Sequence, residues 1–144
     1  MIKKMLTQLS IFLKNVPGTF SKFLDLLIDH DIEIRAVTVA ENNDWGLLLL
    51  LVDKPRECVD LLDKNEYSVS MTQVIAVKVP SKSSNAMGLK KIADVLGKND
   101  VNIDFLYSTL VKDESLIIVK VNDNEKAIDV LEENGFLLEK REAF

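Results

Sequence analysis

Apolar residues recur along the chain at two spacings, one typical of strands and one typical of helices. Leu9, Ile11 and Leu13 alternate with less apolar residues, as expected for a strand with one face on a core. The next apolar residues are three and four positions apart, which predicts one stripe of a helix: Phe20, Phe23, Leu24, Leu27 and Ile28. Residues 32–41 and 47–52 then predict an antiparallel hairpin closed by a polar turn.

A second helix and a fourth strand complete this half of the chain. Pro55 suits the first turn of that helix, and Cys58 and Leu62 belong to its apolar side. Residues 67–71 predict the strand. The second half has the same order of elements, which we expect at 74–79, 88–97, 101–111, 115–121, 125–133 and 136–139.

The two halves match each other in one register. Residues 69 positions apart agree over most of the length, and the identical pairs include Lys22 and Lys91, Asp25 and Asp94, Asp31 and Asp100, and Ile34 and Ile103. Before the first helix the spacing is 65, because Thr7-Gln8 matches Thr72-Gln73, which predicts about four extra residues near 81–84. We therefore expect two domains, residues 1–72 and 73–144.

The order of elements is that of the ferredoxin-like fold, made twice. The alternation changes phase after Ala36 and after Phe105, so we expect a bulge in the second strand of each repeat. That strand lies at a sheet edge, and we expect the two copies to pair. The expected fold is α+β, with one eight-stranded antiparallel sheet and four helices on one face. Because residues 47–52 are apolar on both faces, we expect a homodimer that covers the helix-free face.

Charge argues against a nucleic-acid partner. The 144 residues include 18 Lys and Arg against 23 Asp and Glu, a net charge of −5 that would repel a phosphate backbone. Residues 11–16 loosely fit the first-strand motif of an RNA-recognition domain, with an aromatic at Phe12. The third strands lack the aromatic and basic residues that such domains need to stack bases. Phe12 is therefore interpreted as a sheet residue covered by a partner.

One cysteine and no signal-peptide pattern favour a cytoplasmic protein. The longest apolar run, 47–52, is far shorter than the roughly twenty residues of a membrane span. Cys58 has no cysteine or histidine at ligand spacing, and it is expected to be a buried helix residue. His30, the only histidine, falls at the end of the first helix, where it suits the helix dipole. We therefore expect neither an enzyme nor a metal or cofactor protein.

The strand and helix order, the Asn-Val-Pro-Gly loop at 15–18 and the Asp-Ile-Glu-Ile and Asp-Val-Asn-Ile segments together resemble the ACT domain. The chain is similar to small proteins made of two tandem ACT domains, in which the first begins QLSIFL and has an AEN turn, as at 40–42 here. The resemblance implies amino-acid binding and regulation of amino-acid metabolism. Because both halves are expected to be ACT repeats and no effector domain is expected, the regulated enzyme would be a separate chain.

The first loop has the chemistry of a ligand site. Pro17 pre-sets φ for a first helical position, Gly18 admits a close ligand, and the N–H groups of Gly18, Thr19 and Phe20 are expected to be free for a carboxylate. Asn15 is then able to accept from an ammonium group. The resemblance implies that Asn102, at the start of the second strand of the other repeat, completes this site. The predicted site residues are Asn15, Val16, Pro17, Gly18, Thr19, Phe20 and Asn102.

The symmetry-related site departs from this pattern. Its loop has no proline, carries the extension, and faces a glutamate where the first site has Asn102, so a second ligand is doubtful. Its residues are Glu33, Asn85, Ala86, Met87 and Gly88. Two functions stay open: an amino-acid sensor, or an assembly module and regulatory subunit that binds no ligand of its own. An Asn-X-Pro-Gly sequence is also an ordinary start of a helix.

Overall fold

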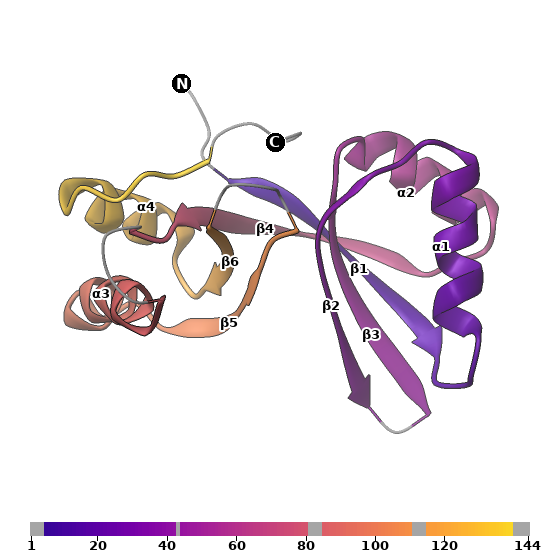
Figure 1. The fold of residues 1–144 in the computed structure, drawn as a ribbon, viewed down its shortest axis with the longest axis horizontal. Helices are drawn as coiled ribbons and strands as arrows, with labels where there is room; N and C mark the ends of the chain where they lie inside the picture. Colours follow the sequence, from indigo (N-terminus) through magenta and orange to yellow (C-terminus); the bar gives the residue numbers. More distant parts are fainter. Residues whose placement is uncertain (1–4, 43, 81–84, 111–114, 140–144) are drawn as a thin grey trace. The chain divides into compact units, whose positions relative to one another are not determined.

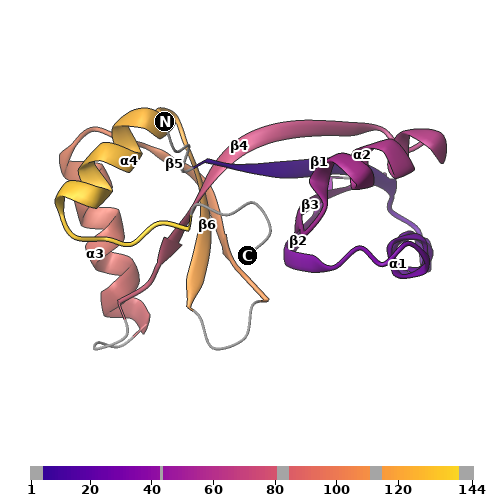
Figure 2. The ribbon, with the colours of Figure 1, turned by 90° about the horizontal axis from the view of Figure 1, so that it is seen from above.

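The computed structural model describes residues 5–42, 44–80, 85–110 and 115–139. The chain forms two compact units (Figures 1 and 2). The first unit comprises residues 7–72, and the second comprises the described part of 73–142 together with Met5 and Leu6. The elements are β1 (Leu6–Lys14), α1 (Thr19–Asp29), β2 (Ile34–Asn42), β3 (Trp45–Val52), α2 (Pro55–Lys64), β4 (Val69–Lys78), α3 (Asn85–Lys98), β5 (Ile103–Ser108), β6 (Leu116–Val121) and α4 (Asn124–Glu133).

The core of the first unit lies between two helices and one face of its strands. The alternating residues of β1 are buried there with the inner residues of β3, α1 and α2: Leu9, Ile11, Leu13, Leu48, Leu50, Phe23, Leu27, Cys58 and Leu62. The predicted apolar stripe of α1 is therefore confirmed at its central residues, Phe23 and Leu27. Ile28 is 69% exposed, so the apolar stripe of α1 is narrower than predicted on that side.

The second unit repeats this packing with a shifted first strand. Leu9 pairs with Leu50 in the first unit, and Ile75 pairs with Val119 in the second. The partners Leu50 and Val119 are 69 positions apart, whereas Leu9 and Ile75 are 66 apart. The predicted spacing of 65 is wrong, because it would turn every apolar side chain of β4 to the opposite face. The second repeat has three extra residues before α3, where four were predicted.

The sheet has six strands, in the order β2-β3-β1-β4-β6-β5, so the prediction of eight is wrong. Two predicted strands, 67–71 and 74–79, are one continuous strand, β4, because no glycine or proline interrupts residues 69–78. The last predicted strand is reduced to a single antiparallel bridge between Val77 and Leu138. Each unit has a pair of helices, which gives four within the described residues.

The predicted bulges are present at equivalent places. The register shifts between Ile34 and Ala36 in β2 and between Ile103 and Phe105 in β5. The predicted pairing of these two strands within the chain is wrong, because β2 and β5 stand at opposite ends of the strand order. Each of them is an edge strand with one neighbour.

All four helices end in the same backbone motif. The residue after the C-cap has a left-handed backbone conformation, with φ between 55° and 84° at Asp31, Glu66, Asp100 and Gly135. In each case the next N–H reaches back to the carbonyl five residues earlier, as from Val101 to Leu96 at 2.9 Å. This is the Schellman ending, which glycine adopts most easily. Three of the four positions hold an acidic residue, at the helix end that least suits a negative charge.

We expect Asp100→Gly to stabilise the protein by about 1 kcal/mol, because glycine removes the left-handed strain and the carboxylate leaves the helix C-terminus. The gain is net of the larger entropy of glycine in the unfolded chain. Urea unfolding followed by circular dichroism measures the change. Gly135→Ala is the matched control, with φ at 84°, and should lose about 1 kcal/mol. Destabilisation by Asp100→Gly would contradict this account.

Candidate functional site

The loop before α1 is a β-turn over residues 16–19. The Thr19 N–H donates to the Val16 carbonyl at 3.3 Å. Gly18 has φ 88° and ψ −11°, which are the angles of the third residue of a type II turn, and Pro17 holds the second position that this turn prefers. A Cβ on Gly18 would meet no atom within 4 Å, so the backbone angle requires the glycine while the space around it stays open.

Two details of the predicted loop chemistry are wrong. Helix α1 begins at Thr19, so Pro17 belongs to the turn and does not hold the first helical position. The Thr19 N–H is bonded within the turn and is not available to a ligand. The loop is also tied to the tip of the neighbouring hairpin, because the Asn15 N–H donates to the Asp44 carbonyl at 2.9 Å.

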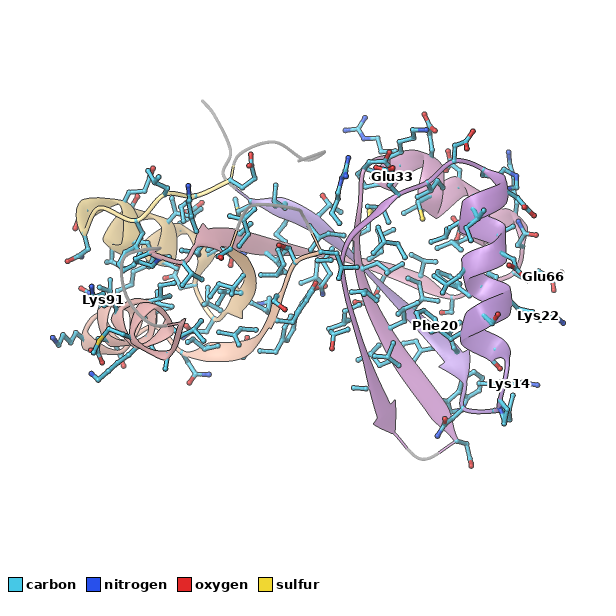
Figure 3. All side chains as sticks on the ribbon, viewed as in Figure 1. Lys14, Phe20, Lys22, Glu33, Glu66 and Lys91 are labelled. Carbon is cyan, nitrogen blue, oxygen red and sulfur yellow. The ribbon has the colours of Figure 1, made fainter. Side chains whose placement is uncertain are left out.

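The N-terminus of α1 has neither the side-chain hydrogen bond nor the acidic residue that usually compensates the unpaired N–H groups of a helix. Gly18 is the N-cap residue and offers no side-chain bond, and the first turn holds no acidic residue. Helix α4 is capped by the Asp123 carboxylate, which accepts from the Lys126 N–H at 3.1 Å. The end of α1 is therefore electropositive and uncapped. Lys14, which ends β1, lies near this end of the helix (Figure 3).

Asn102 is an exposed residue immediately before β5. Its side-chain amide donates to the Asp104 carboxylate at 3.1 Å, and its main-chain N–H donates to the Asn122 side chain at 2.9 Å. Glu33 holds the equivalent position before β2, where its N–H donates to the Asp53 carboxylate at 3.0 Å. The structure thus places Asn15 in the first unit and Asn102 in the second. The predicted composite site stays a prediction, and the two strands on whose pairing it was based are not neighbours in the order of the described strands.

The second predicted loop has a different local structure. Helix α3 already begins at Asn85, so Ala86, Met87 and Gly88 are helical. Gly88 is buried, and a Cβ there would lie 2.5 Å from Cγ1 of Val79. This glycine lets α3 pack against the end of β4, which is a structural role.

Glu33, the remaining residue of the weaker site, already has a cationic partner. Its carboxylate lies 3.1 Å from the Arg35 guanidinium, and both side chains reach solvent. Such an exposed pair is weak, but it competes with any bound cation. Ser84, which the prediction placed in this loop, lies outside the described residues.

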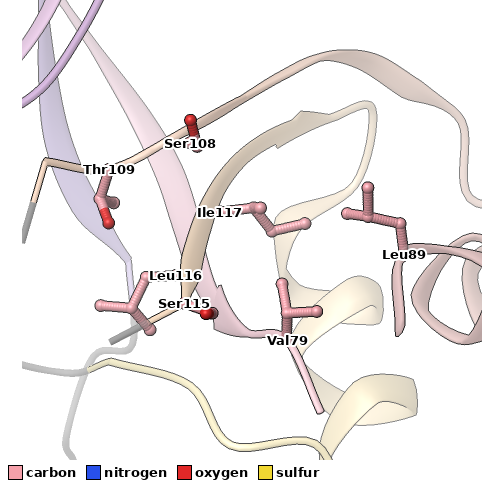
Figure 4. A pocket seen from close by; sticks show the side chains of 7 residues that line it. All are labelled: Val79, Leu89, Ser108, Thr109, Ser115, Leu116 and Ile117. Carbon is pink, nitrogen blue, oxygen red and sulfur yellow. The ribbon is translucent and has the colours of Figure 1, made fainter. Parts of the chain in front are cut away.

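A cavity of about 310 Å³ beside α3 was not predicted. Figure 4 shows its lining: Val79, Leu89, Ser108, Thr109, Ser115, Leu116 and Ile117. Three of these residues, Ser108, Thr109 and Ser115, carry hydroxyls, and the first repeat has Val39, Ala40 and Gly46 at the equivalent positions. This difference between the repeats is the feature of the sequence that could have indicated the cavity. Oγ1 of Thr109 is buried and makes no hydrogen bond with the described residues.

Candidate nucleophiles and ligands are separated from one another. Cys58 is buried in the first core, and His30 caps α1, where Nδ1–H donates to the Leu26 carbonyl at 3.0 Å. Within the described residues no three histidine, cysteine or acidic side chains are grouped as a metal site would require. No helix in this part of the chain is both long and apolar enough to cross a membrane.

Burial raises the pKa of the Cys58 thiol to about 11, and the nearby Asp53 carboxylate adds to the effect. Above pH 9 the thiol ionises in the unfolded chain but stays protonated in the folded one. Its contribution to stability is therefore full below pH 9 and is lost as the pH rises through about 11.

We expect the free energy of unfolding of the wild type to approach that of Cys58→Ala between pH 9 and 11, because alanine does not ionise. Urea unfolding of both proteins at a series of pH values measures the difference. A thiol reagent at pH 8 should label Cys58 only after unfolding. Rapid labelling of the folded protein would show that the side chain is accessible, contrary to the structure.

This architecture is shared with known proteins. A family model described as an ACT domain pair matches residues 4–142. The solved structure of protein BT0572 from Bacteroides thetaiotaomicron is 27% identical with a TM-score of 0.88, over 97% of this chain and 95% of that chain. Comparison with curated protein sequences gives no significant match.

Two more distant structures share the fold. The ligand-free regulatory subunit of aspartate kinase from Thermus thermophilus is 12% identical, with a TM-score of 0.68 over 94% of this chain and 96% of that chain. Aspartate kinase from Clostridium acetobutylicum is 17% identical, with a TM-score of 0.52 over 90% of this chain and 33% of that chain. The chain thus spans about a third of that kinase and nearly all of the separate regulatory subunit.

Proposed function

The chain belongs to the ACT domain pair family, and on that premise we propose that it is a non-catalytic regulator that senses a small amino acid. The observation that carries the proposal is the uncapped N-terminus of α1, set after a type II turn that keeps its surroundings open. A helix end of this kind attracts a carboxylate. Every free amino acid supplies one.

In the proposed complex, the ligand carboxylate accepts from N–H groups in the first turn of α1, with Phe20 beside it. The ammonium group donates to the Asn15 side chain. Asn102 of the neighbouring repeat closes the site. Its side-chain N–H donates to Asp104, whereas its side-chain oxygen Oδ1 accepts no hydrogen bond from the described residues and suits an ammonium donor.

We further propose that Asn102 comes from a second chain. Within one chain β2 and β5 are edge strands at opposite ends of the strand order. A homodimer in which β2 of one protomer pairs with β5 of the other would satisfy both open edges. It would bring the loop at 15–18 toward a partner's second ACT domain. As part of this proposal, we place the boundary between the two ACT domains between residues 72 and 73. We also propose that the protein is cytoplasmic.

An assembly module without its own ligand is the alternative. Two solved neighbours are an aspartate kinase and a regulatory subunit of one, which favours a regulated enzyme as a separate partner chain. In that case the uncapped end of α1 would bind no amino acid, and the protein would not regulate its partner through ligand binding. The two functions differ in one measurable respect, which is whether a free amino acid stabilises the protein.

We expect at least one amino acid to raise the melting temperature of dialysed protein. A ligand at a hundred times its dissociation constant adds about 2.7 kcal/mol of stability. Asn15→Ala and Asn102→Ala should each abolish the shift, whereas Ala86→Ser, at the weaker predicted site in α3, should keep it. No shift with any amino acid would favour the assembly module.

Mixing the two variants tests where Asn102 comes from. Equal amounts of Asn15→Ala and Asn102→Ala chains, unfolded and refolded together, should recover about a quarter of the binding sites, because half of the dimers are mixed and each has one intact site. Light scattering on the same samples gives the oligomeric state. No recovery in a confirmed mixed dimer would place both asparagines of a site in one chain.

A further inference from the structure

A second cavity opens in the first unit, where α2 ends and β4 begins. Its volume is about 510 Å³, and its lining is Phe12, Trp45, Glu66, Tyr67 and Ser68. Phe12 alternates with the core residues Ile11 and Leu13 of β1, so it lies on the sheet face opposite the helices. None of the five lining residues belongs to the loop at 15–18 or to α1.

Three of the five lining residues are aromatic, and two of these are half exposed. Phe12 and Trp45 have exposed fractions of 50% and 49%. They are diagonal neighbours across adjacent strands, because Phe12 pairs with Leu47 and Lys14 pairs with Trp45. Exposed apolar side chains that adjoin one another on one face are typical of a binding surface, whereas single ones are common on any protein.

A ring contact and main-chain hydrogen bonds hold two of the lining residues, Tyr67 and Glu66, in place. The ring of Tyr67 stands edge-on to the buried Phe23 ring, with centroids 5.4 Å apart. Glu66 occupies the left-handed position after α2, and its N–H donates to the Asp63 carbonyl at 3.1 Å. The Tyr67 N–H donates to the Leu62 carbonyl at 2.9 Å. The positions of both residues in the lining are thus fixed by the helix ending.

The lining has the chemistry of a site for organic cations. Aromatic faces attract a cation through their quadrupole, and alkylated ammonium and guanidinium groups are the usual ligands. Glu66 is the one charged residue among the five, and it is negative. Within the lining, the Glu66 carboxylate would repel an anion, whereas a cation with apolar surface would be attracted by that carboxylate and by the aromatic faces. Lys14, the cross-strand partner of Trp45, lies on the same face but is not among the lining residues.

The second repeat provides an internal comparison. The equivalent cavity there holds about 230 Å³ and is lined by Lys78, Val79, Pro80, Gly135, Phe136 and Leu137. By the spacings of 66 and 69, Lys78 stands for Phe12 and Gly135 for Glu66. At these two positions an aromatic ring is replaced by a cation and a carboxylate is lost, whereas the counterpart of Trp45, residue 114, lies outside the described residues. The same fold therefore does not impose the aromatic and acidic lining, which is particular to the first repeat.

We propose that the cavity lined by Phe12, Trp45 and Glu66 binds a small organic cation that carries an alkylated ammonium or a guanidinium group. This site is independent of the amino-acid site proposed above. Its ligand is selected by positive charge on apolar surface, and Tyr67 and Phe12 supply the walls.

Trp45 is the single tryptophan of the sequence, so its fluorescence reports on this cavity. We expect choline and arginine amide to change that fluorescence saturably at constant ionic strength. The neutral isostere of choline, 3,3-dimethyl-1-butanol, should bind at least about threefold more weakly, as expected for losing one cation–π contact. Equal binding of the neutral compound would overturn the proposal.

Glu66→Gln keeps the shape of the side chain and removes its charge. It should weaken choline binding by roughly three- to tenfold, and Phe12→Lys, which copies the second repeat, should abolish it. Glu133→Gln changes the net charge equally at an exposed position of the second unit, outside the cavity lining, and should leave choline binding unchanged. Circular dichroism of each variant confirms that it is folded. Unchanged binding in folded Glu66→Gln and Phe12→Lys would refute the site.

Trp45 follows Asp44, whose carbonyl holds the first loop, so the fluorescence could also respond to the amino-acid site. Asn15→Ala separates the two. It should lose the amino-acid response and keep the choline response. Loss of both would show that the cation binds at the loop and not in the cavity. If wild-type fluorescence does not respond, the indole N–H signal of Trp45 in NMR spectra gives a second reading, and no shift with choline would end the proposal.

Discussion

The antiparallel register of the central strands is the constraint on which both units depend. Leu9 faces Leu50 in one unit, and Ile75 faces Val119 in the other. Each register turns one face of the strands to a pair of helices, and a slip of one residue would expose that whole core. The bulges in β2 and β5 then correct the facing of the edge strands. Helix endings, bulges and cores consequently recur at the same places in both repeats.

The repeats diverge where this constraint is weakest, at the loops that lead into their first helices. Gly18 has open space around it and a backbone angle that only glycine adopts easily, whereas Gly88 is inside a helix and packs against Val79. One glycine keeps a helix end accessible, and the other brings a helix close to a strand. The same residue type thus serves opposite purposes in the two copies. The duplicated fold has been kept while the chemistry of its surfaces has changed.

Periodicity predicted the elements well because burial imposes it. The helix stripe around Phe23, the bulges and Pro55 at the start of α2 are all confirmed. The number of strands was wrong because the sequence does not mark where β4 passes from one unit into the next. The spacing of 65 was wrong because two polar residues, Thr7 and Gln8, were aligned without regard to sheet facing. The sequence did not predict the aromatic cavity because Trp45 directly follows polar residues of the hairpin turn, and only the register shows which strand residues it adjoins.

The central claim is that only the first of two equivalent helix ends is a ligand site, so the stoichiometry of binding tests it most directly. Isothermal titration of the folded protein with the amino acid that stabilises it should give one ligand per chain. Asn15→Ala should reduce this to none. Two equivalent ligands per chain, or one that persists in folded Asn15→Ala, would contradict the account.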